Sequence, residues 1–277
     1  LGEGRNGKGK TVEIIKHFLG IENCANIPIQ QLEEDQFAMG ELFNKMANLS
    51  ADISSTALKN TGHFKSLTGR DLISAQRKFL PRVHFINYAK LIFCANELPI
   101  SYDTTMAFWN RWILLEFPYT FYSQKEYDKL SAKDKTMAKL GDPDIIQKIV
   151  SPEELSGLLN WALEGLKRLL ENGDFSYSKN TEQVKNMWIR KSDSFEAFLL
   201  DEVKFDGNEH TTKAALVKAY SDYCKEHKVK PRGDKHIKFL LTANGAYDER
   251  ILEGDVQTYI WTGVVLEKHE GIIQKIL

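Results

Sequence analysis

Long hydrophobic runs are missing from this sequence of 277 residues, and so is an excess of charge of either sign. No apolar stretch approaches the roughly 18 residues that a membrane-spanning helix needs, and no signal peptide is recognisable. There are only three cysteines, Cys24, Cys94 and Cys224, which are widely separated and cannot all pair. These absences favour a reducing, intracellular setting without membrane association, and we expect a cytoplasmic location.

The net charge of -1 gives no general attraction to nucleic acid. A protein that grips DNA through a few loops need not be basic overall, so the distribution of charge matters more than its sum. The apolar fraction of 42% suffices for a core. The length favours a domain of about 190 residues followed by a smaller one.

The most informative segment is residues 2–11, GEGRNGKGKT, which looks like a phosphate-binding loop with two registers. The pattern GxxxxGK[ST] assigns Lys10 to the β- and γ-phosphates and Thr11 to Mg²⁺. The alternative makes Lys8 the phosphate lysine and leaves Gly9 where a hydroxyl is expected. In both registers glycines let backbone N–H groups approach the phosphates, and the helix that follows adds a favourable dipole. The candidate nucleotide contacts are Gly2, Glu3, Gly4, Arg5, Asn6, Gly7, Lys8, Gly9, Lys10 and Thr11.

Helical periodicity over residues 11–19 and three short apolar runs, at 46–53, 91–95 and 112–117, predict a helix and three buried strands. This alternation favours an α/β layer structure. A phosphate loop normally follows a buried strand, and only Leu1 precedes this loop. We therefore expect the chain to be a fragment of a longer protein.

The C-terminal half begins with a clear helix signal, because Ser151-Pro152-Glu153-Glu154 combines an N-cap, a first-turn proline and a capping-box glutamate. Residues 173–183 look like a linker. The unit after it has predicted helices near 193–204, 211–227 and 234–244, then strands around 247–252 and 256–265. This order is typical of a winged helix-turn-helix.

Taken in order, several segments resemble the superfamily 3 helicase domain of phage- and plasmid-type primase–helicases, which are related to the poxvirus helicase-primase. The resemblance spans nearly the whole chain. Its segments are the Gly-x-Gly-x-Asn-Gly-Lys form at 2–8 with Leu19-Gly20, then LFNKMANLSAD at 42–52, FKSLTGRD at 64–71, KLIFCANELP at 90–99, FWNRW at 108–112 and NWALEGL at 160–166.

The resemblance implies an α/β fold in which a P-loop NTPase (AAA+-like) core with helical additions precedes a small winged helix-turn-helix domain. The implied boundaries are 1–120 for the core, 121–183 for its helical extension and 190–277 for the winged-helix domain. The implied activity is ATP hydrolysis with Mg²⁺, coupled to translocation on single-stranded DNA by a homo-hexameric ring. A primase domain upstream, contacts with duplex DNA and a prokaryotic phage, plasmid or provirus origin belong to the same expectation.

The resemblance also implies roles for individual residues. It favours Lys8 as the phosphate lysine, Asp52 as the Mg²⁺ carboxylate with Thr11 or a water beside it, and Asn96 as the polar sensor of the γ-phosphate. Arg111 resembles the arginine finger supplied to a neighbouring subunit.

Two departures from the family pattern leave questions open. Relatives carry two acids where this chain has Ala51-Asp52, so the base that activates water is unassigned, with Glu97 as one candidate. Relatives also carry two arginines where this chain has Asn110-Arg111.

Cations interleaved with aromatics mark the expected DNA contacts, because cations suit phosphates and aromatic rings suit stacked bases. The family has a hairpin in the corresponding region that projects into the ring channel. The candidates there are Lys65, Arg77, Lys78, Arg82 and His84, with Phe79, Phe85 and Tyr88 among them. In the terminal unit they are Lys235 and Lys238, with Lys228, Lys230 and Arg232 nearby.

Two other functions fit parts of the pattern. A degenerate proviral module could bind DNA without hydrolysing ATP, and Gly9 favours that interpretation. A small-molecule kinase could use the phosphate loop, but would have no use for a cationic hairpin or a winged helix.

Overall fold

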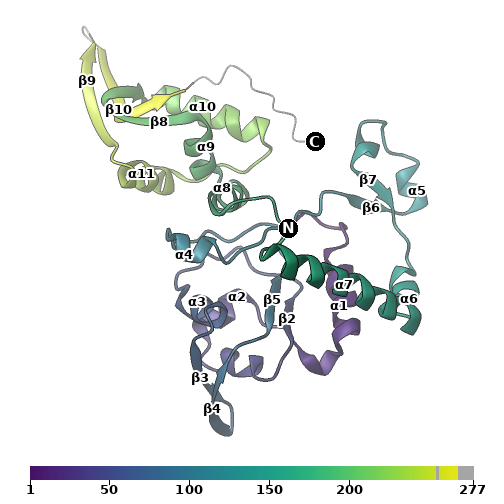
Figure 1. Cartoon of the computed structure of the whole chain (residues 1–277). Helices are drawn as coiled ribbons and strands as arrows, with labels where there is room; N and C mark the ends of the chain where they lie inside the picture. The colour runs from purple at the N-terminus through teal and green to yellow at the C-terminus, as the bar shows by residue number, and fades with distance from the viewer. Residues whose placement is uncertain (254–255, 268–277) are drawn as a thin grey trace. The chain divides into compact units, whose positions relative to one another are not determined.

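The computed structural model describes residues 1–253 and 256–267, and the chain divides into two compact units, Leu1–Val184 and Lys185–Leu277 (Figure 1). Both units combine helices with small sheets, so the chain is a mixed α/β protein, as the sequence predicts. Among the described residues, no helix is long and apolar enough to cross a membrane.

The first unit is built on a parallel sheet of strand order β1-β2-β5. Its helices and strands, followed along the chain, are α1 (Lys8–Leu19), the 3-10 helix η1 (Ile21–Asn23), β1 (Cys24–Ala25), α2 (Ile29–Glu34), η2 (Ala38–Leu42), β2 (Ala47–Ser50), α3 (Gly62–Thr68), β3 (Leu72–Arg77), β4 (Leu80–Ile86), β5 (Lys90–Phe93), α4 (Met106–Trp109), β6 (Thr120–Tyr122), α5 (Gln124–Tyr127), η3 (Asp134–Thr136), β7 (Ala138–Leu140), α6 (Ile145–Ile149) and α7 (Pro152–Asn172).

β2 is the central strand, and all four of its residues are buried. Val12 of α1 packs with Ala47 and Leu49 on one side of β2, so the helix after the glycine loop covers that face of the sheet. On the other side, the Asn48 side chain bonds both backbone groups of Ile27, at 2.8 and 2.9 Å. The strands predicted at 46–53 and 91–95 are therefore present as Ala47–Ser50 and Lys90–Phe93. Only the first is buried along its length, since Lys90 of β5 is exposed and the rest of that strand is half-buried.

The predicted strand at 112–117 is wrong as a regular element, because residues 112–119 form no strand. They are nevertheless extended beside the N-terminus. The Leu1 nitrogen donates to the Leu115 carbonyl, and the Phe117 N–H donates to the Leu1 carbonyl, both at 2.8 Å. These two bonds both belong to Leu1, and the bonds of one residue do not make a ladder. On its other side, the Gly2 N–H donates to the Ala95 carbonyl at 3.2 Å.

β3 and β4 form an antiparallel hairpin between α3 and β5. Ile73, Ala75 and Phe85 turn toward the core, where they join the cluster around Leu32 and Leu67 of α2 and α3. The opposite face and the tip are exposed to solvent. The alternation of buried and exposed residues therefore holds the base of the hairpin on the unit and leaves its tip free.

The segment after residue 119, where the resemblance implies a helical extension, contains two short strands as well as helices. β6 pairs with β7 in parallel, and α6 packs against both α1 and α7. The predicted start of α7 is confirmed, since the Ser151 hydroxyl accepts the Glu154 N–H at 3.3 Å. Gly173 ends the helix in a left-handed backbone conformation, with φ 70°, which is strained for residues that carry a side chain.

The second unit has its own antiparallel sheet, of order β8-β10-β9. The elements are α8 (Thr181–Ser192), which crosses the boundary between the units, then α9 (Ser194–Glu202), β8 (Val203–Thr212), α10 (Lys213–Glu226), α11 (Asp234–Ala243), β9 (Tyr247–Glu253) and β10 (Val256–Leu266). The sequence prediction missed β8. Its alternation is short, and Gly207-Asn208 interrupts it, which disguises a strand that bonds along much of β10.

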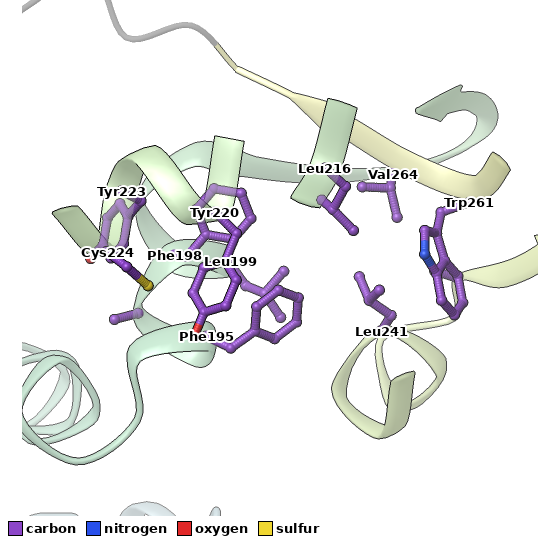
Figure 2. Packing of buried hydrophobic residues seen from close by; sticks show 12 residues of the cluster. Phe195, Phe198, Leu199, Leu216, Tyr220, Tyr223, Cys224, Leu241, Trp261 and Val264 are labelled. Carbon is purple, nitrogen blue, oxygen red and sulfur yellow. The ribbon is translucent and has the colours of Figure 1, made fainter. Parts of the chain in front are cut away.

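An aromatic core holds this unit together (Figure 2). The Phe195 ring meets the Tyr220 ring edge-on at 4.9 Å, so α9 and α10 pack through aromatic contacts. From the sheet, Trp261 and Val264 of β10 close the core, together with Leu241 of α11. The core thus joins three helices to one face of the sheet.

Candidate functional site

The glycine loop, residues 2–7, leads into α1 and is bonded to the segment after β5, where the Gly2 N–H donates to the Ala95 carbonyl. Two of its glycines are required by its shape. Gly2 has φ 153°, and a Cβ there would lie 2.6 Å from the Phe117 carbonyl oxygen. Gly7, the N-cap of α1, has φ 87°. A side chain at Gly2 would collide with the backbone. At Gly7 it would require a left-handed backbone conformation that residues other than glycine rarely adopt.

Gly4 and Gly9 differ, because a Cβ on either would meet no protein atom within 4 Å. Protein packing therefore gives no reason for glycine at these two positions. The close approach of a ligand to the backbone does, since the first N–H groups of α1 have no intrahelical partner. This open side of the loop is the part of the site that fits a phosphate chain.

Lys8 is the cation held inside the loop, with only 7% of its surface exposed. Its ammonium donates to the carbonyls of Gly2 and Glu3, the latter at 3.1 Å. It also donates to the side-chain oxygens of Asn6 at 3.1 Å and Asn96 at 3.0 Å. Burial lowers the pKa of the Lys8 ammonium, and the nearby charges of Cys94 and Asp52 partly offset that effect.

Lys10 and Thr11 point elsewhere. The Lys10 ammonium is exposed and pairs with Glu13 at 3.0 Å on the surface of α1. The Thr11 hydroxyl donates to the Gly7 carbonyl at 3.1 Å. The helix begins at Lys8, three residues before the predicted start at 11, and this turns Lys8 inward and Lys10 outward.

Two polar side chains follow the carboxyl ends of neighbouring parallel strands. Asp52 comes after β2, and Asn96 comes after β5; both are exposed. The charge of Asp52 acts on Lys8, and Asn96 bonds it directly. The structure therefore joins Lys8 and Asn96, which lie 88 positions apart in the sequence. It also places Asp52 after the strand that neighbours β5. Glu97 is exposed next to Asn96.

Arg111 lies on the segment after α4 and, among the described residues, forms no hydrogen bond with Lys8, Asp52 or Asn96. Its guanidinium donates to the Ala107 carbonyl, and a Cβ on Gly69 would be 3.7 Å from its Nη2. The stacking of Phe64 on Trp112, at 4.7 Å between ring centroids, fixes the segment against α3. Arg111 is thus held at a fixed place on the unit.

The hairpin places most of the predicted DNA contacts on its exposed side. Lys78 and Phe79 form the tip; the Phe79 ring is 94% exposed, with its backbone left-handed at φ 60°. Arg82 and His84 are also exposed, while Arg77 is partly covered beside the Phe43 ring. Phe85 does not face solvent, because it packs in the core edge-on to Phe43 at 5.5 Å. Its expected stacking role is therefore not supported.

The remaining predicted DNA contacts differ in their surroundings. Lys65 pairs with the Asp103 carboxylate at 2.8 Å. On α11, Lys235 is exposed, and Lys238 is exposed with Asp248 3.6 Å away. Arg232, expected nearby, bonds the Ser192 carbonyl and lies 3.6 Å from the buried Asp193, so its side chain helps to hold the unit together.

Sequence reasoning missed the wall that β6 forms beside the glycine loop. The Phe121 N–H donates to the Arg5 carbonyl at 2.8 Å, and the Asn6 amide donates to the Phe117 carbonyl at 3.3 Å. The only signal in the sequence is the aromatic run Tyr119 to Tyr122, which carries no pattern linking it to a loop more than 100 residues away.

Residues 1–111 match the model of a protein family described as a family of unknown function (DUF5906). Two curated viral proteins are 25% identical to the chain: "Putative helicase L207/L206" of Acanthamoeba polyphaga mimivirus, over 209 residues and 72% of the chain, and "Putative helicase V13" of Sputnik virophage, over 205 residues and 69% of the chain. The chain spans 21% and 25% of the lengths of these two relatives. Among solved structures, an apo form of the NrS-1 C-terminal region aligns with 95% of the chain and 65% of its own length, at 14% identity and a TM-score of 0.32.

Proposed function

We propose that the chain is the ATP-hydrolysing part of a DNA helicase of superfamily 3. One observation carries this proposal: the buried Lys8 ammonium of the glycine loop bonds the Asn96 side chain at the carboxyl edge of a parallel sheet, the edge where Asp52 follows the neighbouring strand. A buried cation, a carboxylate and an amide at the mouth of a glycine loop are the groups that phosphoryl transfer uses. The similarity to two proteins named as viral helicases supports the same function.

In this proposal Lys8 binds the terminal phosphates, and Asn96 orients the attacking water. Asp52 would hold Mg²⁺, which takes one or two carboxylates together with phosphate oxygens and waters and neutralises phosphate charge when bound. The exposed Asp52 carboxylate, at the carboxyl end of β2, fits that donor set. The Thr11 hydroxyl would have to leave the Gly7 carbonyl to join it, so a water is the simpler ligand.

The arrangement of the strands supports a P-loop core of the AAA+ type. Across the first unit, β1, β2 and β5 are followed by Leu1–Gly2 and then by residues 115–117, all joined by backbone hydrogen bonds. Arg111 is proposed to act on the nucleotide of a neighbouring subunit in a homo-hexameric ring.

The second unit is proposed to be a winged-helix domain. Its order of helix, strand, two helices and a two-stranded hairpin supports this, as does the sheet order β8-β10-β9. α11 would be the recognition helix, with Lys235 and Lys238 exposed to contact phosphates.

The test is ATP hydrolysis measured with and without single-stranded DNA. We expect turnover that DNA stimulates and that Asp52→Ala and Arg111→Ala each abolish, while both variants keep the unfolding midpoint of the parent. Turnover that is indifferent to these substitutions would refute the proposal. DNA binding without ATP binding would instead favour a DNA-binding module that has lost hydrolysis.

A further inference from the structure

The aromatic wall of the glycine loop, formed by Phe121 and Tyr122 of β6, has no part in the phosphate chemistry proposed above. Backbone bonds fix it in place: Leu1 N to Leu115 O, Phe117 N to Leu1 O and Phe121 N to Arg5 O each span 2.8 Å. Residues 115–121 therefore run alongside the chain from Leu1 to Arg5.

The Phe121 ring touches the loop at the residue before α1. A Cβ placed on Gly7 would lie 3.5 Å from Cε2 of that ring, which is ordinary van der Waals contact. The Phe121 side chain is nevertheless 39% exposed. One part of the ring packs on the loop, and another part is free to meet a ligand.

An ion pair between Arg5 of the loop and Glu126 of α5 also joins the loop to the segment that carries the aromatic wall. The Arg5 guanidinium donates to both Glu126 carboxylate oxygens, at 3.0 and 2.6 Å, and its carbon lies 5.1 Å from the centroid of the Tyr122 ring. The hydrogen bond from Arg5 lowers the pKa of Glu126 to about 2, so the carboxylate is ionised at any physiological pH. The position of β6 beside the loop is thus fixed on both sides.

The polarity of the loop decides which end of a nucleotide would meet this wall. Lys8, Asn96 and Asp52 gather on the β5 side, where the reacting terminal phosphate belongs. The nucleoside is attached to the other end of the phosphate chain. A triphosphate bound along the loop therefore directs its nucleoside away from β5, toward the side that β6 lines.

We infer that Phe121 is a nucleobase-binding residue, whose ring stacks on the base of the nucleoside triphosphate held by the glycine loop. The inference rests on the proposed nucleotide-binding function. Stacking does not depend on the hydrogen-bonding edge of a base, because every base has a π-face. The site consequently binds ATP and GTP with affinities within a few-fold of each other.

The inference predicts that a change at Phe121 affects the binding of ATP but not of inorganic triphosphate, which has the phosphates and no base. Calorimetric titration of the chain with each ligand and Mg²⁺ gives the two affinities. Phe121→Leu keeps an apolar contact with Gly7 and removes the ring face. It is expected to weaken ATP binding about 10-fold and to leave triphosphate binding unchanged. Phe121→Trp keeps the ATP affinity, and Phe175→Leu, at a phenylalanine 60% exposed elsewhere in the unit, changes neither ligand.

Two results would overturn the inference: equal weakening of both ligands by Phe121→Leu, which would mean that the ring only shapes the loop, and no weakening of either. Failure of the proposed function looks different. In that case the unmodified chain binds neither ATP nor triphosphate, and Lys8→Ala does not change the titration of either ligand.

Discussion

The Lys8 ammonium donates to the Asn96 side-chain oxygen across 3.0 Å, and this bond joins the glycine loop to the end of β5. The lysine donates to two carbonyls and two amide oxygens of the protein. A bound phosphate chain would replace part of that set with stronger, charge-assisted bonds. In the proposed function, this exchange would free the Asn96 side chain to orient the attacking water.

Asn96→Ala is expected to lower the rate of ATP hydrolysis by ~10²-fold while the dissociation constant for ATP changes little, because one positioned polar group is lost only from the transition state. Steady-state kinetics and equilibrium titration measure the two quantities. Asn26→Ala is the matched control, since Asn26 is an exposed asparagine that follows the edge strand β1. A parallel loss of ATP affinity and turnover would mean that Asn96 only supports the loop.

Phe79→Ala is expected to weaken binding of single-stranded DNA, because the exposed ring at the hairpin tip is a stacking surface worth ~1–3 kcal/mol per base. Fluorescence anisotropy of a labelled oligonucleotide measures the change. Leu72→Ala, at a residue 70% exposed near the base of the same hairpin, should have no effect. If both variants bind DNA like the parent, the hairpin tip is not a DNA contact.

Asp103 predicts how the stability of the first unit depends on pH. Burial opposes its ionisation, but hydrogen bonds from Lys65, Thr105 and Thr61 outweigh that and lower its pKa far below the usual range. A carboxyl whose pKa is lowered by folding stabilises the protein above its unfolded pKa, near 4, and this contribution is lost as the pH falls further.

Asp103→Asn should therefore destabilise the chain by ~2 kcal/mol at pH 7, since hydrogen bonds to a charged group are lost. The difference from the parent should shrink below about pH 4. Urea unfolding across the pH range measures it, with the exposed Glu34→Gln as control. A difference that is constant with pH would show that Asp103 does not titrate in this way. The same variant frees Lys65 from its ion pair. Its affinity for single-stranded DNA, compared with that of the parent, therefore tests whether the pairing limits contact between Lys65 and DNA.

Asp193 is the residue on which the second unit most depends. It is 1% exposed, caps α9 through the N–H groups of Phe195 and Glu196, and pairs with His236 at 2.5 Å. Asp193→Ala should cost ~3–5 kcal/mol of unfolding free energy, because α9 loses its N-cap and the hydrogen bond between His236 and the buried carboxylate is removed. Asp222→Ala, which removes an exposed pair with Lys225 on α10, should leave the unfolding curve unchanged. Similar curves for the two variants would contradict this assignment.

Local signals predicted the elements of the chain better than their surroundings. Ser151, Pro152 and Gly173 mark the ends of α7 correctly, because caps act within one helical turn. The same helix carries leucines at helical spacing, but Leu159, Leu166 and Leu170 are 47–74% exposed. Periodicity reports a shared face and does not identify what covers it.

The candidate site shows the same division. Lys8, Asp52 and Asn96 were expected from the family resemblance, and the parallel pairing of β2 and β5 brings the positions of Asp52 and Asn96 to one edge of the sheet. The wall formed by Phe121 depends on a pairing with Arg5 across 116 residues, which no local pattern encodes. Phe85 was assigned to solvent because a cationic segment hides the alternation that turns this ring into the core.

The most direct test of the central claim, that the loop binds nucleotide through Lys8, is an ATP titration of Lys8→Ala beside Lys10→Ala. The two lysines belong to the same loop, but one is buried against Asn96 and the other pairs with Glu13 on the surface. We predict that Lys8→Ala loses ATP binding by ~10²-fold or more and that Lys10→Ala stays within a few-fold of the parent. ATP binding that survives Lys8→Ala and fails in Lys10→Ala would contradict the account.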